Sequence, residues 1–143
     1  MVQLKMDDSI IIDVLKSVRR IALVGASPKP ERPSHRVMGF LMSKGYEVVP
    51  VNPGLAGKTI HGQPVYGSLA DIPGAIDMVD IFRASAFVRG VVDEALTLSP
   101  LPRVIWMQLD IRDDAAAERA RARGLTVIMD RCPAIEYPRL IGA

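Results

Sequence analysis

The residues that decide the fold are Ile21-Ala22-Leu23-Val24-Gly25, an uninterrupted apolar run that ends in a glycine. A run without polar alternation is typical of a strand buried on both faces, and therefore of a parallel sheet. After a loop over residues 26–33, apolar residues recur at helical spacing from Ser34 until Gly45. This stretch predicts a strand, a tight turn at Gly25 and a helix, which together begin a β-α-β unit.

The same alternation continues along the chain. It predicts an α/β, Rossmann-like, doubly wound parallel sheet of five or six strands with helices on both faces. We expect one domain over residues 1–143, with a core at about 20–140 and an extra N-terminal helix at about 8–18. Further strands are expected at 46–51, 75–82, 104–108 and 125–129, short strands near 59–61 and 65–66, a turn or short helix at 68–73, helices at 85–98 and 113–123, and a proline-punctuated tail at 132–141.

The composition excludes several classes of protein. The 143 residues are 49% hydrophobic and 24% charged, which is the balance of an ordinary globular domain. Cys132 is the single cysteine, so a disulfide framework, a zinc ribbon or an iron–sulfur cluster is excluded, and with two histidines we expect no metal site. A net charge of +2 and 5% aromatic residues do not suggest a nucleic-acid binder.

The sequence also gives no sign of a membrane partner. No window approaches the ~18 consecutive apolar residues that a membrane-spanning helix needs. Residues 1–8 are polar and lack the apolar core and cleavage site of a secretory signal. We therefore expect a cytoplasmic protein.

The loop from Gly25 to Ser34 is the first candidate for a binding site, because ligands of open parallel sheets lie beyond the carboxyl ends of the strands. Glycine permits a close approach of the backbone, and the amides at a helix start favour a phosphate. Lys29, Arg32 and Arg36 add positive charge nearby. The alternative interpretation is a simple turn glycine with solvated cations.

The loop matches neither of two common nucleotide motifs. No second glycine follows Gly25 as in the dinucleotide fingerprint, and no Gly-Lys-Ser/Thr closes a triphosphate loop. After the second expected strand, Asn52-Pro53 stands where an NAD site usually has an acid for the ribose. Asn52 is either part of a plain turn or a neighbour of a ribose that carries phosphate, and both interpretations stay open.

An ordered set of motifs extends over about residues 20–140. The motifs are Val24-Gly25-Ala26-Ser27-Pro28, Arg32-Pro33-Ser34, Gly45-Tyr46-Glu47-Val48-Val49-Pro50-Val51-Asn52-Pro53, Asp80-Ile81-Phe82-Arg83, Trp106-Met107-Gln108 and Asp130-Arg131-Cys132-Pro133. This set resembles the small bacterial CoA-binding proteins, single-domain relatives of the CoA-binding domain of succinyl-CoA synthetase alpha chains.

The resemblance implies coenzyme A as the cofactor, with CoA or acyl-CoA as the binding partner and no catalysis. The loop would hold phosphate, the end of the second strand would border adenosine, and the 82–83 and 106–108 segments would line the continuing cleft. Lys58 is a further candidate cation. The candidate cofactor-binding residues are Gly25, Ala26, Ser27, Pro28, Lys29, Arg32, Ser34, Val51, Asn52, Pro53, Phe82 and Arg83.

We expect no catalytic residues and no ligase activity, because the chain has no room for the second domain with which such synthetases transfer phosphate. The alternative function is an NAD(P)-binding oxidoreductase or a redox regulator, which shares the fold. Cys132 is interpreted as a small buried hydrophobe, with a mixed disulfide to CoA as the other option. Whether the protein has a protein partner or forms a homodimer stays open.

Overall fold

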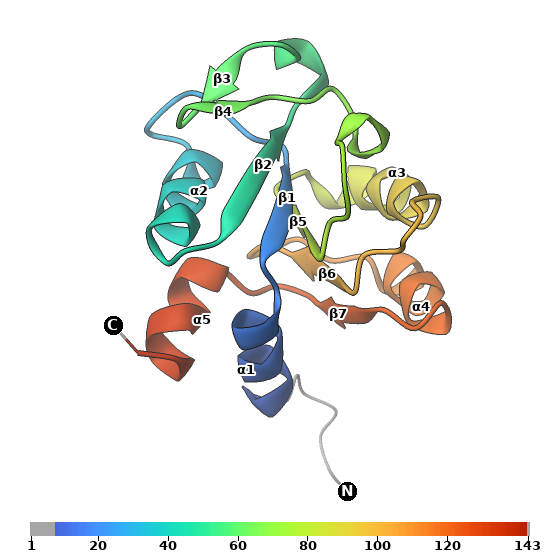
Figure 1. Cartoon of the computed structure of the whole chain (residues 1–143). Coiled ribbons are helices and arrows are strands. Elements are labelled where there is room, and N and C mark those ends of the chain that lie inside the picture. The colour runs from blue at the N-terminus through green and yellow to red at the C-terminus, as the bar shows by residue number, and fades with distance from the viewer. Residues whose placement is uncertain (1–7, 143) are drawn as a thin grey trace, which may run out of the picture.

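The structure is a computed structural model that describes residues 8–142. Most of the segment 1–8, for which we expect no secretory signal, lies outside the described residues. Its centre is a five-stranded parallel sheet with the order β2-β1-β5-β6-β7, which confirms the predicted α/β fold (Figure 1). The strands are β1 (Arg20–Val24), β2 (Glu47–Val51), β5 (Met78–Ile81), β6 (Val104–Met107) and β7 (Thr126–Ile128).

Helices cover both faces of the sheet, as the apolar strands require. Figure 1 shows α1, α2 and α5 on one side and α3 and α4 on the other, and the two buried clusters divide in the same way. The helices are α1 (Asp8–Ser17), α2 (Pro33–Ser43), α3 (Ser85–Ala95), α4 (Asp114–Ala122) and α5 (Pro133–Leu140). Among residues 8–142, no helix has the length and apolar character needed to cross a membrane.

The strand order places a topological switch between β1 and β5. The chain leaves β1 toward β2 on one side, and later returns to pair β5 with the other side of β1. The connections that follow these two neighbouring strands therefore diverge at the carboxyl edge. A crevice at such a point is where open parallel sheets bind their ligands.

A small hairpin, β3 (Thr59–Ile60) and β4 (Gln63–Pro64), follows the short helix η1 (Pro53–Leu55). The prediction of a strand at 65–66 was wrong, because His61 and Gly62 both adopt positive φ and form a two-residue turn that pairs Ile60 with Gln63. Tyr66 makes only a single bridge, to Val51. The predicted turn at 68–73 contains the short helix η2 (Leu69–Asp71).

The expected proline-punctuated tail is instead the helix α5. Pro133 stands in its first turn, where the missing N–H costs nothing, and Pro138 lies inside the helix. Packing outweighs that proline: the Tyr137 ring makes edge-to-face contacts with Phe40 and Tyr46, at centroid separations of 5.9 and 6.3 Å. Aromatic rings thus fix a helix that local sequence disfavours.

Asp80 is an acid inside the apolar core. It is fully buried between Leu23 and Trp106, its neighbours on β1 and β6. Neither of its carboxyl oxygens has a hydrogen-bond partner among residues 8–142. Burial therefore raises the pKa of Asp80 well above its ordinary value, which favours the protonated form.

This acid makes stability depend on pH in a definite direction. Below the unfolded pKa of about 3.9, Asp80 is protonated in both states and carries no ionisation cost. As the pH rises toward the raised folded pKa, the unfolded chain ionises while the folded chain keeps its proton, so stability is lost. Asp80→Asn removes this loss. We expect its melting temperature, relative to the original protein, to be higher at about pH 8 than at about pH 4. An unchanged difference between the two pH values would contradict the assignment.

Candidate functional site

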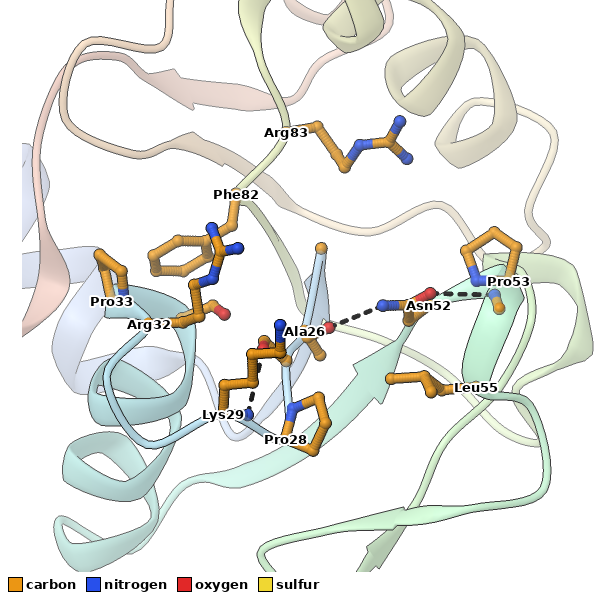
Figure 2. Close-up of a pocket in the computed structure, with 14 residues that line it drawn as sticks. Ala26, Pro28, Lys29, Arg32, Pro33, Asn52, Pro53, Leu55, Phe82 and Arg83 are labelled. Carbon is orange, nitrogen blue, oxygen red and sulfur yellow. Dashed lines mark hydrogen bonds between the residues drawn. The ribbon is translucent and has the colours of Figure 1, made fainter.

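A cleft of about 820 Å³ opens at the carboxyl ends of β1, β2 and β5, at the topological switch (Figure 2). Its size is within the range of small-molecule and cofactor sites. It is lined by Gly25, Ala26, Ser27, Pro28, Lys29, Arg32, Pro33, Ser34, Asn52, Pro53, Gly54, Leu55, Phe82 and Arg83.

Gly25 is required where β1 meets the cleft. Its φ is +93°, and a Cβ at this position would lie 2.7 Å from the backbone oxygen of Phe82. The N–H groups of Gly25 and Ala26 both donate to the carbonyl of Val51, at 3.0 and 3.2 Å. These two amides therefore hold the loop against β2 and are not available to a ligand.

Asn52 connects the two sides of the cleft. Its Nδ2 donates to the Ala26 carbonyl at 2.9 Å, and its Oδ1 accepts from the Gly54 N–H at 2.9 Å (Figure 2). The side chain therefore closes the turn after β2 and also ties that turn to the loop after β1. A carboxylate here would lose the donated hydrogen bond, so the uncharged amide is suited to this position.

The charged side chains of the lining are Lys29, Arg32 and Arg83, and no carboxylate of residues 8–142 lines the cleft. Figure 2 shows Arg32 beside Phe82 on the α2 side and Arg83 apart from them, with its guanidinium 4.3 Å from the centroid of the Phe87 ring. Arg32 is also the residue before α2, and no side chain caps the start of this helix. Positive charge and the amino end of a helix dipole therefore meet in one cleft, which favours an anion.

The structure brings every predicted site residue to this cleft except Val51, which is buried in β2 and contributes only its carbonyl to the loop. Two candidate cations lie outside it: Arg36, whose guanidinium donates to the Glu31 carbonyl, and Lys58. Sequence reasoning missed Pro33, Gly54 and Leu55 as lining residues, although the Arg32-Pro33-Ser34 motif and the Asn52-Pro53-Gly54 turn could have indicated them.

The 106–108 segment does not line this cleft. Trp106 is fully buried and its Nε1 donates to the Arg131 carbonyl at 2.8 Å, so it is a core residue and not part of the cleft. Gln108 is buried just beyond the end of β6. Their side chains lie two strands away from the loop after β1.

Two histidines fasten the β3–β4 hairpin to α2. The His35 and His61 rings lie 3.9 Å apart, and the His61 Nε2 is 2.8 Å from the His35 carbonyl. Gly39 makes room, because a Cβ there would be 3.0 Å from the His61 ring. Burial, and secondarily the neighbouring His61, lower the pKa of His35, which favours the neutral form of the His35 ring.

Cys132 is a free cysteine that is 6% exposed and lies at the start of α5. It is not among the residues that line the cleft. Within residues 8–142, no group of three or more His, Cys, Asp and Glu side chains is placed to hold a metal ion.

The parallel sheet, its switch point and the cation-lined cleft define a Rossmann-like domain whose ligand site lies at the carboxyl edge. The family of CoA binding domains matches residues 19–138, and the chain belongs to this family.

Several individual proteins are similar to this chain. The uncharacterized protein YneT of Bacillus subtilis is 39% identical over 123 residues, which cover 85% of this chain and 87% of YneT. The alpha subunit of an ADP-forming acetate–CoA ligase from Pyrococcus furiosus is 33% identical over 87 residues, but these cover only 19% of that subunit and 58% of this chain. The solved structure of a hypothetical protein from Pyrococcus horikoshii superposes with a TM-score of 0.91 at 35% identity, over 99% of this chain and 100% of the other.

The close approach at Gly25 makes a prediction about stability. Gly25→Ala should destabilise the protein by about 2–3 kcal/mol, because alanine combines a positive φ with a backbone clash. Gly90→Ala is the matched control: Gly90 lies within α3, and a Cβ there meets nothing within 4 Å. Alanine at that position should stabilise by about 0.5–1 kcal/mol. Urea denaturation measures both. Equal stability of the two variants would show that Gly25 is not constrained.

Proposed function

We propose that this chain binds CoA or acyl-CoA in the cleft and does so without catalysing a reaction. The observation that carries the proposal is the cleft's charge: Lys29, Arg32 and Arg83 line it, no carboxylate in the described part of the chain does, and the uncharged Asn52 stands at the end of β2. CoA carries a pyrophosphate and a ribose 3′-phosphate, so its nucleotide end needs cations and is repelled by an acid at the ribose. Membership in the family of CoA binding domains supports the same ligand.

The phosphate donors follow from the hydrogen bonds already made. The amides of Gly25 and Ala26 are engaged with Val51, and the Ser27 hydroxyl accepts from the Lys29 N–H at 3.1 Å. The N–H groups of Ser27 and Ser34 have no such partner among the described residues, and Ser34 lies in the first turn of α2. These amides and the Arg32 guanidinium would hold the pyrophosphate.

The adenosine end would lie over the turn after β2. Asn52 is half-buried, Pro53 and Gly54 are exposed, and Leu55 gives an apolar surface for a base. An acid at this position would accept from the two ribose hydroxyls of NAD. Its replacement by an amide that is already bonded to Ala26 favours a phosphorylated ribose over NAD.

The absence of catalysis is proposed from the chemistry of the lining. The titratable side chains there are Lys29, Arg32 and Arg83, all of them cations suited to binding. Cys132 is buried outside the cleft, which argues against a covalent adduct with the CoA thiol. We infer that the protein carries or senses CoA or acyl-CoA. It would present this ligand to a protein partner or to a second copy of the chain.

Calorimetric titration with CoA, dephospho-CoA, NAD and NADP tests the ligand. We expect CoA to bind most tightly, and dephospho-CoA to bind about tenfold or more weakly because one charged contact is lost. Tightest binding of NADP would transfer the assignment to an NAD(P)-dependent oxidoreductase or redox regulator. Binding of none of the four would reject the proposed ligand.

A pair of arginine variants tests the site. Arg32→Ala should weaken CoA binding about ten- to hundredfold and reduce its dependence on salt, because it removes a guanidinium from the cleft. Arg36→Ala removes the same charge from a side chain that bonds to Glu31 and does not line the cleft. Its effect should be about twofold or less. Equal losses in the two variants would mean that only the general positive potential matters, and Arg32 would leave the site.

A further inference from the structure

The turn of the β3–β4 hairpin contains a strained residue. His61 and Gly62 are its two central residues, with φ of 50° and 78°, so both are in the left-handed region. Glycine, asparagine and aspartate are the usual residues of such a turn, and a histidine there carries a conformational cost. The binding proposed for CoA uses neither residue. A histidine kept at this position therefore points to an interaction that offsets the strain.

The interaction that His61 makes is with α2. Its ring lies against the ring of His35, with the centroids 3.9 Å apart and the planes inclined by 31°. Its Nε2 is 2.8 Å from the His35 carbonyl, and because a carbonyl only accepts, this nitrogen carries a proton and donates. Gly39 leaves the space, since a Cβ there would lie 3.0 Å from the His61 Cε1. The His61 side chain therefore fastens the hairpin to α2.

This contact links two segments that line the cleft. His35 directly follows the lining residue Ser34, and the hairpin with His61 continues from the lining residue Leu55. The Lys58 N–H donates to the Leu55 carbonyl at 3.0 Å, which bonds the hairpin to the lining turn. In Figure 1 the hairpin lies above α2. Neither histidine lines the cleft itself, so the pair acts on a ligand through the positions of these two segments.

The contact tolerates one positive charge and not two. The bond to the His35 carbonyl persists whether the His61 ring is neutral or charged, because its Nε2 carries a proton in both forms. Two charged rings at 3.9 Å repel each other. The amino end of the α2 dipole adds to the cost of a charge on His35, which stands in the first turn.

The surrounding charges do not neutralise the pair. On the α2 side the charged neighbours are Glu31, Arg32 and Arg36, and the hairpin carries Lys58. Glu31 favours the charged form of His35, but burial and the second ring have larger effects and lower the pKa of His35. Among residues 8–142, neither histidine forms an ion pair with a carboxylate. A released ring would regain the ordinary pKa of about 6.5, so release is favoured as the pH falls through that value.

We propose that His35 and His61 form a pH-sensitive clasp, which holds the β3–β4 hairpin on α2 at neutral pH and releases it in mild acid, when both rings become charged. The released hairpin no longer supports the turn at residues 53–55, so the cleft holds its ligand less tightly. This second consequence rests on the proposed function, whereas the release itself does not.

Hydrogen exchange tests the release in the absence of ligand. The Val65 N–H, which donates to the Lys58 carbonyl at 2.8 Å, reports on the hairpin. Ile105, in the central strand β6 between β5 and β7, reports on opening of the whole sheet. We expect the protection factor of the Val65 amide to fall about tenfold between about pH 7.5 and about pH 5.5, and that of the Ile105 amide to stay unchanged.

His35→Phe is the matched variant. It keeps a ring for stacking and the backbone carbonyl for the bond from His61, and it removes one of the two charges. A charged imidazole is attracted to the face of a phenyl ring, so acid should no longer lower the protection of Val65. His61→Asn is the second variant, because asparagine suits the left-handed turn and carries no charge. Its protection at Val65 should be low at both pH values.

Calorimetric titration with CoA tests the effect on the cleft. The 3′-phosphate of CoA itself loses charge near its second pKa of about 6, which weakens binding to every variant. The quantity compared is therefore the additional loss in the unaltered protein. We expect its affinity to fall about threefold or more beyond the fall in His35→Phe over the same pH range.

The outcomes separate the clasp from the proposed function. If the protection of Val65 does not depend on pH, or falls equally in His35→Phe, the clasp is rejected and the proposed function stands. If the hairpin is released but both proteins lose the same affinity for CoA, the coupling to the cleft is rejected. If no variant binds CoA at either pH, the proposed function fails, and hydrogen exchange still decides the clasp. Should His35→Phe not fold, His61→Asn decides the question.

Discussion

The contact between Gly25 and the backbone of Phe82 is the constraint on which the rest of the site depends. β1 and β5 are direct neighbours, and their connections must diverge as soon as the strands end. The chain can turn away from β1 only with a positive φ and without a Cβ, since a Cβ would lie 2.7 Å from the Phe82 oxygen. The space between the diverging connections is the cleft. The Asn52 side chain then keeps the loop and the next turn at a fixed separation.

Polar groups around the cleft and polar groups in the core differ in whether the protein satisfies their hydrogen bonds. Around the cleft, loop amides that could serve a ligand are partly consumed by the fold, and positive side chains take over the contact with anions. In the core the reverse holds: both carboxyl oxygens of Asp80 and the Oε1 of Gln108 are buried without a hydrogen-bond partner in the described part of the chain. A core built only for stability would have apolar residues at both positions, because an unpaired buried carboxyl costs free energy without return.

The sequence predicts the sheet, the helices on both faces and the position of the cleft, because each depends on local signals. Apolar runs such as 21–24 identify buried strands, and the rule for carboxyl edges identifies the loops. The helix at 133–140 was not predictable in this way, since its prolines disfavour it and distant aromatic rings stabilise it. The lack of hydrogen-bond partners for the Asp80 carboxyl was equally unpredictable from the sequence, because its neighbours Leu23 and Trp106 come from remote parts of the chain.

The packing of α1 against α5 has a consequence for how the protein folds during its synthesis. α1 and α5 lie side by side on one face of the sheet, and Arg139 forms ion pairs with Asp8 and with Glu136 (Figure 1). Chains are made from the N-terminus onward, so β1 and α2 exist for some time while the apolar surface that α5 covers remains bare. The ribosome-bound nascent chain therefore exposes Tyr46 and Phe40 until residues 133–140 emerge, and during that interval a chaperone has the most apolar surface to bind.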